Sequence, residues 1–67
     1  MHFIKVKTCS GNIEYICIEH ISSFGYMGSE YTQIFMQNGE YYNVEGNIID
    51  NLLKLIREAN IGKVYNL

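Results

Sequence analysis

Three groups of turn-forming residues divide the first part of the chain, and they constrain its fold more than any other feature. The groups are Ser10-Gly11-Asn12, Gly28-Ser29-Glu30 and Gln37-Asn38-Gly39. The segments between them are rich in Ile, Val, Phe, Tyr and Thr, which are enriched in β-strands. Short loops between such segments join antiparallel neighbours. We therefore expect strands at residues 2–8, 13–18, 21–27, 31–36 and 40–44, with one helical turn between the second and the third.

The alternation of apolar and polar residues predicts the register of these three hairpins, because a slip of one residue sends every side chain to the opposite face. Three-residue loops separate apolar from polar side chains in each hairpin. In the first hairpin this register pairs Val6 with Ile16 and Ile4 with Ile18. The predicted pairs in the other two are Phe24 with Ile34, Tyr26 with Thr32, Ile34 with Tyr42, and Thr32 with Val44. Glu30 is poorly suited to the left-handed position of such a loop, which Gly and Asn accept more easily.

The apolar period changes from two to 3.6 after residue 44, which predicts an amphipathic helix at residues 48–59. Asn47 is the expected N-cap, Asp50 lies in the first turn, and Asn60-Ile61-Gly62 supplies stop signals. No Pro and no low-complexity linker interrupts the chain. The predicted fold class is α+β, with a curled antiparallel sheet of about five strands packed by one C-terminal helix. Residues 1–62 form the expected single domain and residues 63–67 a tail.

The predicted register gives the sheet two apolar faces instead of one. The helix is expected to cover Ile4, Val6, Ile16, Ile18, Phe24, Tyr26, Ile34, Tyr42 and Val44. The opposite face carries Phe3, Tyr15, Cys17, Tyr31, Phe35 and Tyr41, interleaved with Lys5, Lys7, Gln33 and Asn43. Antiparallel sheets commonly expose one polar face to water, so an outer face rich in aromatic residues is unusual and calls for an explanation.

Three explanations of the aromatic face remain open. Tyr and Phe favour strands and could simply be half exposed. A second copy or another protein could cover the face, since aromatic residues are enriched at interfaces. Nucleic-acid bases could stack on the rings beside Lys5 and Lys7, although a formal net charge of −2 disfavours a phosphate-binding surface.

Residues capable of catalysis are present but do not form a recognisable constellation. Lys5, expected opposite Cys17, could lower the pKa of that thiol, yet no His is placed to act as its base. Glu19 and His20 are adjacent in a connecting turn, for which a solvated turn is the default interpretation. Gly25 and Gly28 lack the following helix of a phosphate-binding loop. We therefore expect no enzymatic activity and no cofactor.

The composition narrows the other possibilities for so short a chain. His2 and His20 lie outside any Cys-x-x-Cys arrangement, so no structural metal is expected. Cys9 and Cys17 follow no secretory segment, and no apolar stretch is long enough to span a bilayer, which predicts a reduced, cytoplasmic chain without a membrane partner. Domains of about this size usually need a disulfide, a metal or oligomerisation for stability. Because neither a disulfide nor a metal is expected, self-association remains as the source of additional stability.

The run of residues 31–44, with its Asn38-Gly39 turn and the following Tyr and Val, resembles the small FlbD-like proteins of bacterial motility operons. This resemblance covers nearly the whole chain and implies a small bacterial protein, with no established active site to transfer. The chain is also similar to the first half of LytTR DNA-binding domains, which have Gly-Asn-Tyr where this sequence has Gly28-Ser29-Glu30-Tyr31. The His-Arg-Ser motif of that family has no counterpart here, which argues against DNA binding.

The sequence thus predicts a non-enzymatic interaction domain that works through a homo-oligomer or a protein partner. The six aromatic-face residues Phe3, Tyr15, Cys17, Tyr31, Phe35 and Tyr41 are the predicted interface. A LytTR-like or base-stacking nucleic-acid module is the alternative.

Overall fold

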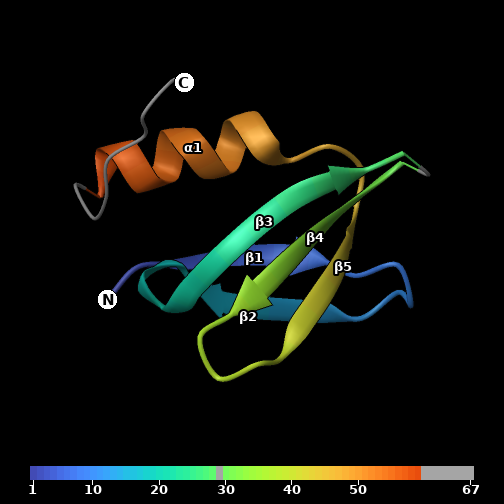
Figure 1. Ribbon diagram of the computed structural model, residues 1–67, viewed down its shortest axis with the longest axis horizontal. Helices are drawn as coiled ribbons and strands as arrows, with labels where there is room; N and C mark the ends of the chain where they lie inside the picture. The colour runs from blue at the N-terminus through green and yellow to red at the C-terminus, as the bar shows by residue number, and fades with distance from the viewer. Residues whose placement is uncertain (29, 60–67) are drawn as a thin grey trace.

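The computed structural model describes residues 1–28 and 30–59, and it has an α+β fold with five antiparallel strands and one C-terminal helix. Figure 1 shows the helix above the strands, along one side of the molecule. The elements are β1 (Phe3–Lys7), β2 (Ile13–Cys17), the 3-10 turn η1 (Ile18–His20), β3 (Ile21–Met27), β4 (Tyr31–Met36), β5 (Tyr41–Glu45) and α1 (Ile49–Glu58).

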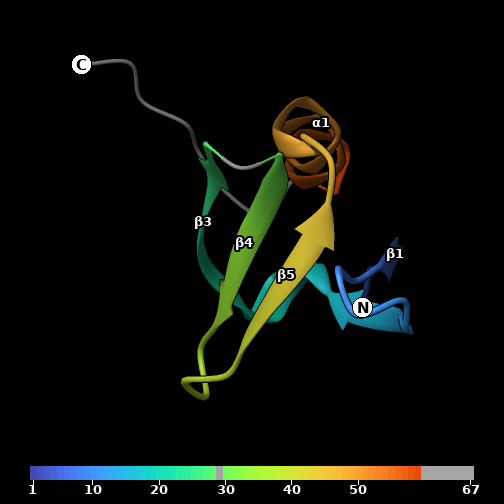
Figure 2. The same ribbon diagram turned by 90° about the vertical axis from the view of Figure 1, so that its right-hand side faces the viewer.

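The strands form two sheets, so the prediction of one curled sheet is not confirmed. One sheet contains β1 and β2, and the other has the order β3-β4-β5. The η1 turn separates β2 from β3 along the chain, and its Ile18 is buried. The sheets meet where a single bridge pairs Thr8 with Val44 and the Cys9 N–H donates to the Asn43 carbonyl at 2.9 Å. Figure 2 shows the two sheets as separate layers, with α1 viewed nearly end-on beside β5.

The three-stranded sheet has the register that the sequence predicts. Phe24 lies opposite Ile34, and Ile34 lies opposite Tyr42. Thr32 likewise lies between Tyr26 and Val44. The turns lie where the sequence predicts them, and any odd slip would have moved the apolar residues to the outside.

The predicted register of the first hairpin is wrong by two residues. Ile4, not Val6, lies opposite Ile16, and Val6 lies opposite Glu14. The three-residue loop lies at residues 9–11 instead of 10–12, because Gly11, with a φ of 91°, takes the left-handed position in place of Asn12. Thr8 and Asn12 close this loop: the Thr8 N–H donates to the Asn12 carbonyl at 2.8 Å, and the Thr8 hydroxyl accepts from the Asn12 N–H at 3.2 Å. A shift of two preserves the side-chain faces but changes every cross-strand neighbour.

The core lies between the two sheets and α1. Its buried members are Val6, Ile16, Ile34, Val44 and Leu52, and the partly buried residues packed against them are Ile4, Ile21, Phe24, Met36, Tyr42 and Ile48. Tyr26 departs from the prediction, because its side chain is exposed near the end of the edge strand β3.

The helix begins one residue later than its predicted cap implies. Ile48 occupies the N-cap position, and Asn47 Oδ1 accepts from the Ile49 N–H at 3.1 Å. A core side chain fixes this junction: the Thr32 hydroxyl donates to the Gly46 carbonyl at 2.7 Å and accepts from the Ile48 N–H at 3.0 Å. The predicted stop signals at residues 60–62 and the tail at 63–67 lie outside the described residues.

Candidate functional site

Part of the predicted interface lies on the outer face of the β1–β2 sheet. Phe3 is 58% exposed and Tyr15 is 66% exposed. Phe3 pairs with Cys17 across the sheet, whereas Lys5 pairs with Tyr15. The expectation that Lys5 lies opposite Cys17 is therefore wrong, since it followed from the incorrect register. Cys17 itself is buried, so this group presents two rings and a lysine to the surface.

The other predicted interface residues lie on the three-stranded sheet. Phe35 and Tyr41 are cross-strand neighbours whose ring centroids are 6.0 Å apart, and both are exposed. Tyr31 is half buried and lies opposite Glu45. The structure thus separates the six residues into two groups of three, one on each sheet, where the sequence predicted a single continuous face.

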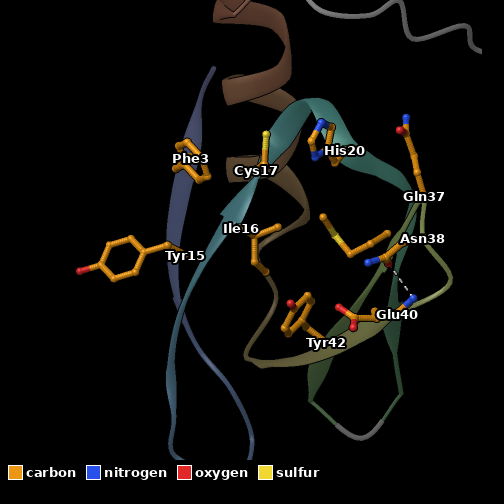
Figure 3. A pocket seen from close by; sticks show the side chains of 10 residues that line it. Phe3, Tyr15, Ile16, Cys17, His20, Gln37, Asn38, Glu40 and Tyr42 are labelled. Carbon is orange, nitrogen blue, oxygen red and sulfur yellow. Dashed lines mark hydrogen bonds between the residues drawn. The ribbon is translucent and has the colours of Figure 1, made fainter.

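A hollow of about 490 Å³ opens between β2 and the β4–β5 turn. Figure 3 shows residues of β2 on one side and residues of the turn on the other, with Ile16 and Tyr42 between them. The lining residues are Phe3, Tyr15, Ile16, Cys17, His20, Met36, Gln37, Asn38, Glu40 and Tyr42. The turn is held in place because Asn38 Oδ1 accepts from the Glu40 N–H at 2.9 Å and the Gln37 N–H donates to the His20 carbonyl at 2.9 Å.

A second hollow, of about 580 Å³, lies between the β1–β2 loop and β5. Its lining residues are Thr8, Cys9, Ser10, Asn12, Glu14, Tyr41, Tyr42 and Asn43. Tyr42 lines both hollows, while Glu14 and Ile16 from the inner face of β2 line one each. The two hollows therefore follow one another along β2. Sequence reasoning did not predict this groove, since it depends on how the two sheets sit relative to each other.

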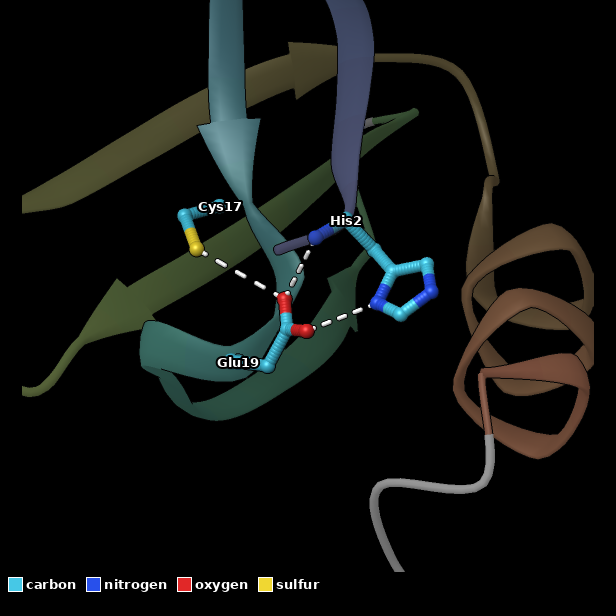
Figure 4. A network of polar contacts seen from close by, with 3 residues as sticks. All are labelled: His2, Cys17 and Glu19. Atoms are coloured by element: carbon cyan, nitrogen blue, oxygen red, sulfur yellow. Dashed lines mark hydrogen bonds and ion pairs between the residues drawn. The ribbon is translucent and has the colours of Figure 1, made fainter.

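The sequence left Glu19 beside His20, but the structure pairs it with His2. The His2 backbone N–H donates to Glu19 Oε1 at 2.8 Å, and His2 Nδ1 lies 2.7 Å from Glu19 Oε2 (Figure 4). The β1–β2 ladder brings these residues together, since the Ile18 N–H donates to the His2 carbonyl at 2.8 Å. Their contact could have been inferred from the correct register of that hairpin.

Cys17 joins this polar cluster through a long contact, with its Sγ 3.6 Å from Glu19 Oε1. The carboxylate therefore lies between the thiol and the His2 imidazole (Figure 4). The side-chain hydrogen bond from His2, followed by the one from its backbone N–H, lowers the pKa of Glu19 from 4.5 to about 2. A carboxylate with so low a pKa is a weak base at neutral pH. These hydrogen bonds hold His2 against η1.

Two further properties concern the described residues only. No group of three or more His, Cys, Asp or Glu side chains gathers into a metal-binding arrangement in residues 1–28 and 30–59. In the same part of the chain, no helix combines the length and the apolar character needed to cross a membrane.

Comparisons of the chain with protein-family models, with curated proteins and with solved structures found no match. The resemblance to FlbD-like proteins and to LytTR domains therefore remains a prediction from the sequence.

Proposed function

We propose that this chain is a small non-enzymatic interaction domain of the cytoplasm that associates with a second copy of itself through its exposed aromatic residues. The observation that carries the proposal is the exposure of rings on the outer faces of both sheets, with Tyr15 at 66% and Tyr41 at 57%. Large exposed apolar groups on a small domain are typical of binding surfaces. Tyr and Phe also contribute most of the energy of many protein interfaces.

The exposed rings occur in groups rather than singly, which supports an interface. Phe35 and Tyr41 are neighbours across two strands, and Phe3 lies on the same face as Tyr15. Ile13, which is half exposed, extends the group of Phe3 and Tyr15 along β2. Two groups on different sheets allow each copy to contact more than one neighbour.

Light scattering of untagged protein over a concentration series tests this function. We expect a mass above that of the single chain, which falls toward it when Tyr15→Glu or Tyr41→Glu places a charge among the rings. Lys54→Glu is the control for the charge change, because Lys54 is exposed on α1 and belongs to neither group of rings. A wild-type chain that stays monomeric at every concentration contradicts the proposal, as does a mass that neither aromatic variant lowers.

A nucleic-acid module is the second candidate, and the pairing of Lys5 with Tyr15 favours it. Phe3, Lys5, Lys7 and Tyr15 share one outer face, so bases could stack on rings beside ammonium groups. The affinity of such a surface for single-stranded DNA or RNA should fall steeply with salt and on changing both lysines to Gln. A titration without binding at low salt eliminates this candidate.

A further inference from the structure

The backbone of β2 has a free edge. In an antiparallel pair, residues that exchange hydrogen bonds with the partner strand alternate with residues whose N–H and C=O point away from it. The bonds that flank the β1–β2 ladder, Ile18 N–H to His2 and Thr8 N–H to Asn12, place the even-numbered residues of β2 in the bonded positions. The polar backbone groups of Ile13, Tyr15 and Cys17 therefore point away from β1. No other strand pairs with that side of β2 in residues 1–28 and 30–59.

The groove described above runs along this free edge. Tyr15, Ile16 and Cys17 all line the first hollow, although successive side chains of a strand point to opposite faces. One hollow reaches both faces of a strand only by passing around its edge, and β1 covers the other edge. An extended segment in the groove can therefore form hydrogen bonds with β2 while its side chains enter the space beside Ile16 and Tyr42.

The charges along the groove favour a basic segment over a second copy of β2. Glu14 lines the second hollow and Glu40 the first, whereas none of the described lining residues is Lys or Arg. A second β2 would bring another Glu14 into this acidic groove. A Lys or Arg side chain would instead form an ion pair there.

We propose that the free edge of β2 binds an extended segment of another protein that carries an apolar residue and a Lys or Arg two positions apart. This inference rests on the proposed role in protein binding and adds a second class of partner. The spacing follows from β2 itself: Ile16 and Glu14 are two residues apart on one face, so the residues opposite them in an added strand are also two apart. The apolar side chain contacts Ile16, Met36 and Tyr42, and the basic one approaches Glu14. Backbone bonds supply affinity and the two side chains supply specificity, as in other cases of strand addition.

A nine-residue synthetic peptide, Thr-Thr-Thr-Val-Thr-Lys-Thr-Thr-Thr, is a direct probe of this site. We expect it to shift the amide NMR signals of Ile13, Tyr15 and Cys17 and to slow the hydrogen exchange of these amides. Replacing its Lys with Glu should weaken binding about fivefold at low salt, on the scale of one exposed ion pair. Methylating the alternate backbone nitrogens that face β2 should abolish binding. The inference is wrong if the peptide shifts no β2 amide, or if the methylated peptide binds as well.

Two substitutions at Tyr15 separate the strand edge from the aromatic surface. Tyr15→Pro removes an N–H that points away from β1, so it should weaken peptide binding about fivefold or more, as expected for the loss of a hydrogen bond. Tyr15→Ala keeps that N–H and removes only the ring, so it should lower self-association and still bind the peptide. Equal peptide binding by the Pro and Ala variants contradicts the edge model. If Tyr15→Pro does not fold, the methylated peptide still decides the question on the wild-type chain.

The two proposals can fail separately in these measurements. A wild-type chain that self-associates but leaves its β2 amides unchanged with peptide refutes strand addition alone. A monomeric wild-type chain that binds the peptide at β2 refutes self-association and supports strand addition.

Discussion

Removing the Thr32 hydroxyl should destabilise the protein far more than the small size of this group suggests. Thr32 lies near the start of β4, the central strand of the three-stranded sheet, and is completely buried. Its hydroxyl donates to the Gly46 carbonyl and accepts from the Ile48 N–H, so one oxygen holds the chain where it leaves β5 and enters α1. Thr32→Val keeps the shape of the side chain and leaves both backbone groups without this partner.

The expected cost is about 3 kcal/mol of unfolding free energy. The lost bond to Gly46 accounts for about 1 kcal/mol, and an unpaired N–H at Ile48 adds about 2 kcal/mol. A domain of this length is stable by only about 3–10 kcal/mol in total. The melting temperature should therefore fall by about 15 °C or more.

Urea unfolding followed by circular dichroism measures this change. Thr32→Ser is the matched control, because it keeps the hydroxyl and loses one methyl group, at a cost of about 1 kcal/mol. The Val variant should also show faster hydrogen exchange at the Ile48 amide, whereas the Ser variant should not. A Val variant as stable as the wild type, or one more stable than the Ser variant, would refute the role assigned to this hydroxyl.

The remaining predictions concern one carboxyl group and two turns. The Glu19 pKa is depressed from 4.5 to about 2 by the hydrogen bonds from His2, so its contribution to stability is present above about pH 4.5 and is lost as the pH falls toward 2. Glu19→Gln should flatten the pH dependence of urea unfolding in this window, and an unchanged profile would contradict the assignment. Glu30 has a φ of 72°, so Glu30→Gly should raise the unfolding free energy by about 1 kcal/mol. Gly39 has a φ of 91° and open space around it, so Gly39→Ala should lower the unfolding free energy by about 1 kcal/mol through the backbone alone; equal stability of either turn variant and the wild type would contradict its prediction.

The predictability of the fold differs between the two sheets for a physical reason. In β3, β4 and β5 the apolar alternation is long and Gly39 suits its turn, so both registers followed from the sequence. In the first hairpin the loop has the predicted three residues but begins one residue earlier, since Gly11 takes its left-handed position and Thr8 bonds to Asn12 across it. A loop that moves by one residue shifts the register by two and leaves every side chain on its face, so the apolar pattern does not report the difference. Ile18 added to the error, since it belongs to η1 and not to β2.

The candidate site was predictable only as far as the faces of single strands are predictable. Phe3, Tyr15, Phe35 and Tyr41 are exposed as their alternation indicates. Their division into two groups depends on the break between the sheets, where the main chain turns at η1 and the sheets meet at one bridge. Periodicity describes each strand separately, so it carries no information on that break.

The first hairpin shows how a register error of two residues affects a functional interpretation. Because side chains alternate with a period of two, such an error leaves Tyr15 and Lys5 on the same outer face but changes the neighbour of each. The incorrect register placed an ammonium beside the Cys17 thiol and so suggested an activated nucleophile. The observed register places the Phe3 ring opposite Cys17 and the Lys5 ammonium opposite Tyr15. A conclusion that depends only on which face a side chain occupies, such as the exposed aromatic surface, is unaffected by this kind of error. A conclusion that depends on a particular pair of neighbours, such as a reactive cysteine, is lost.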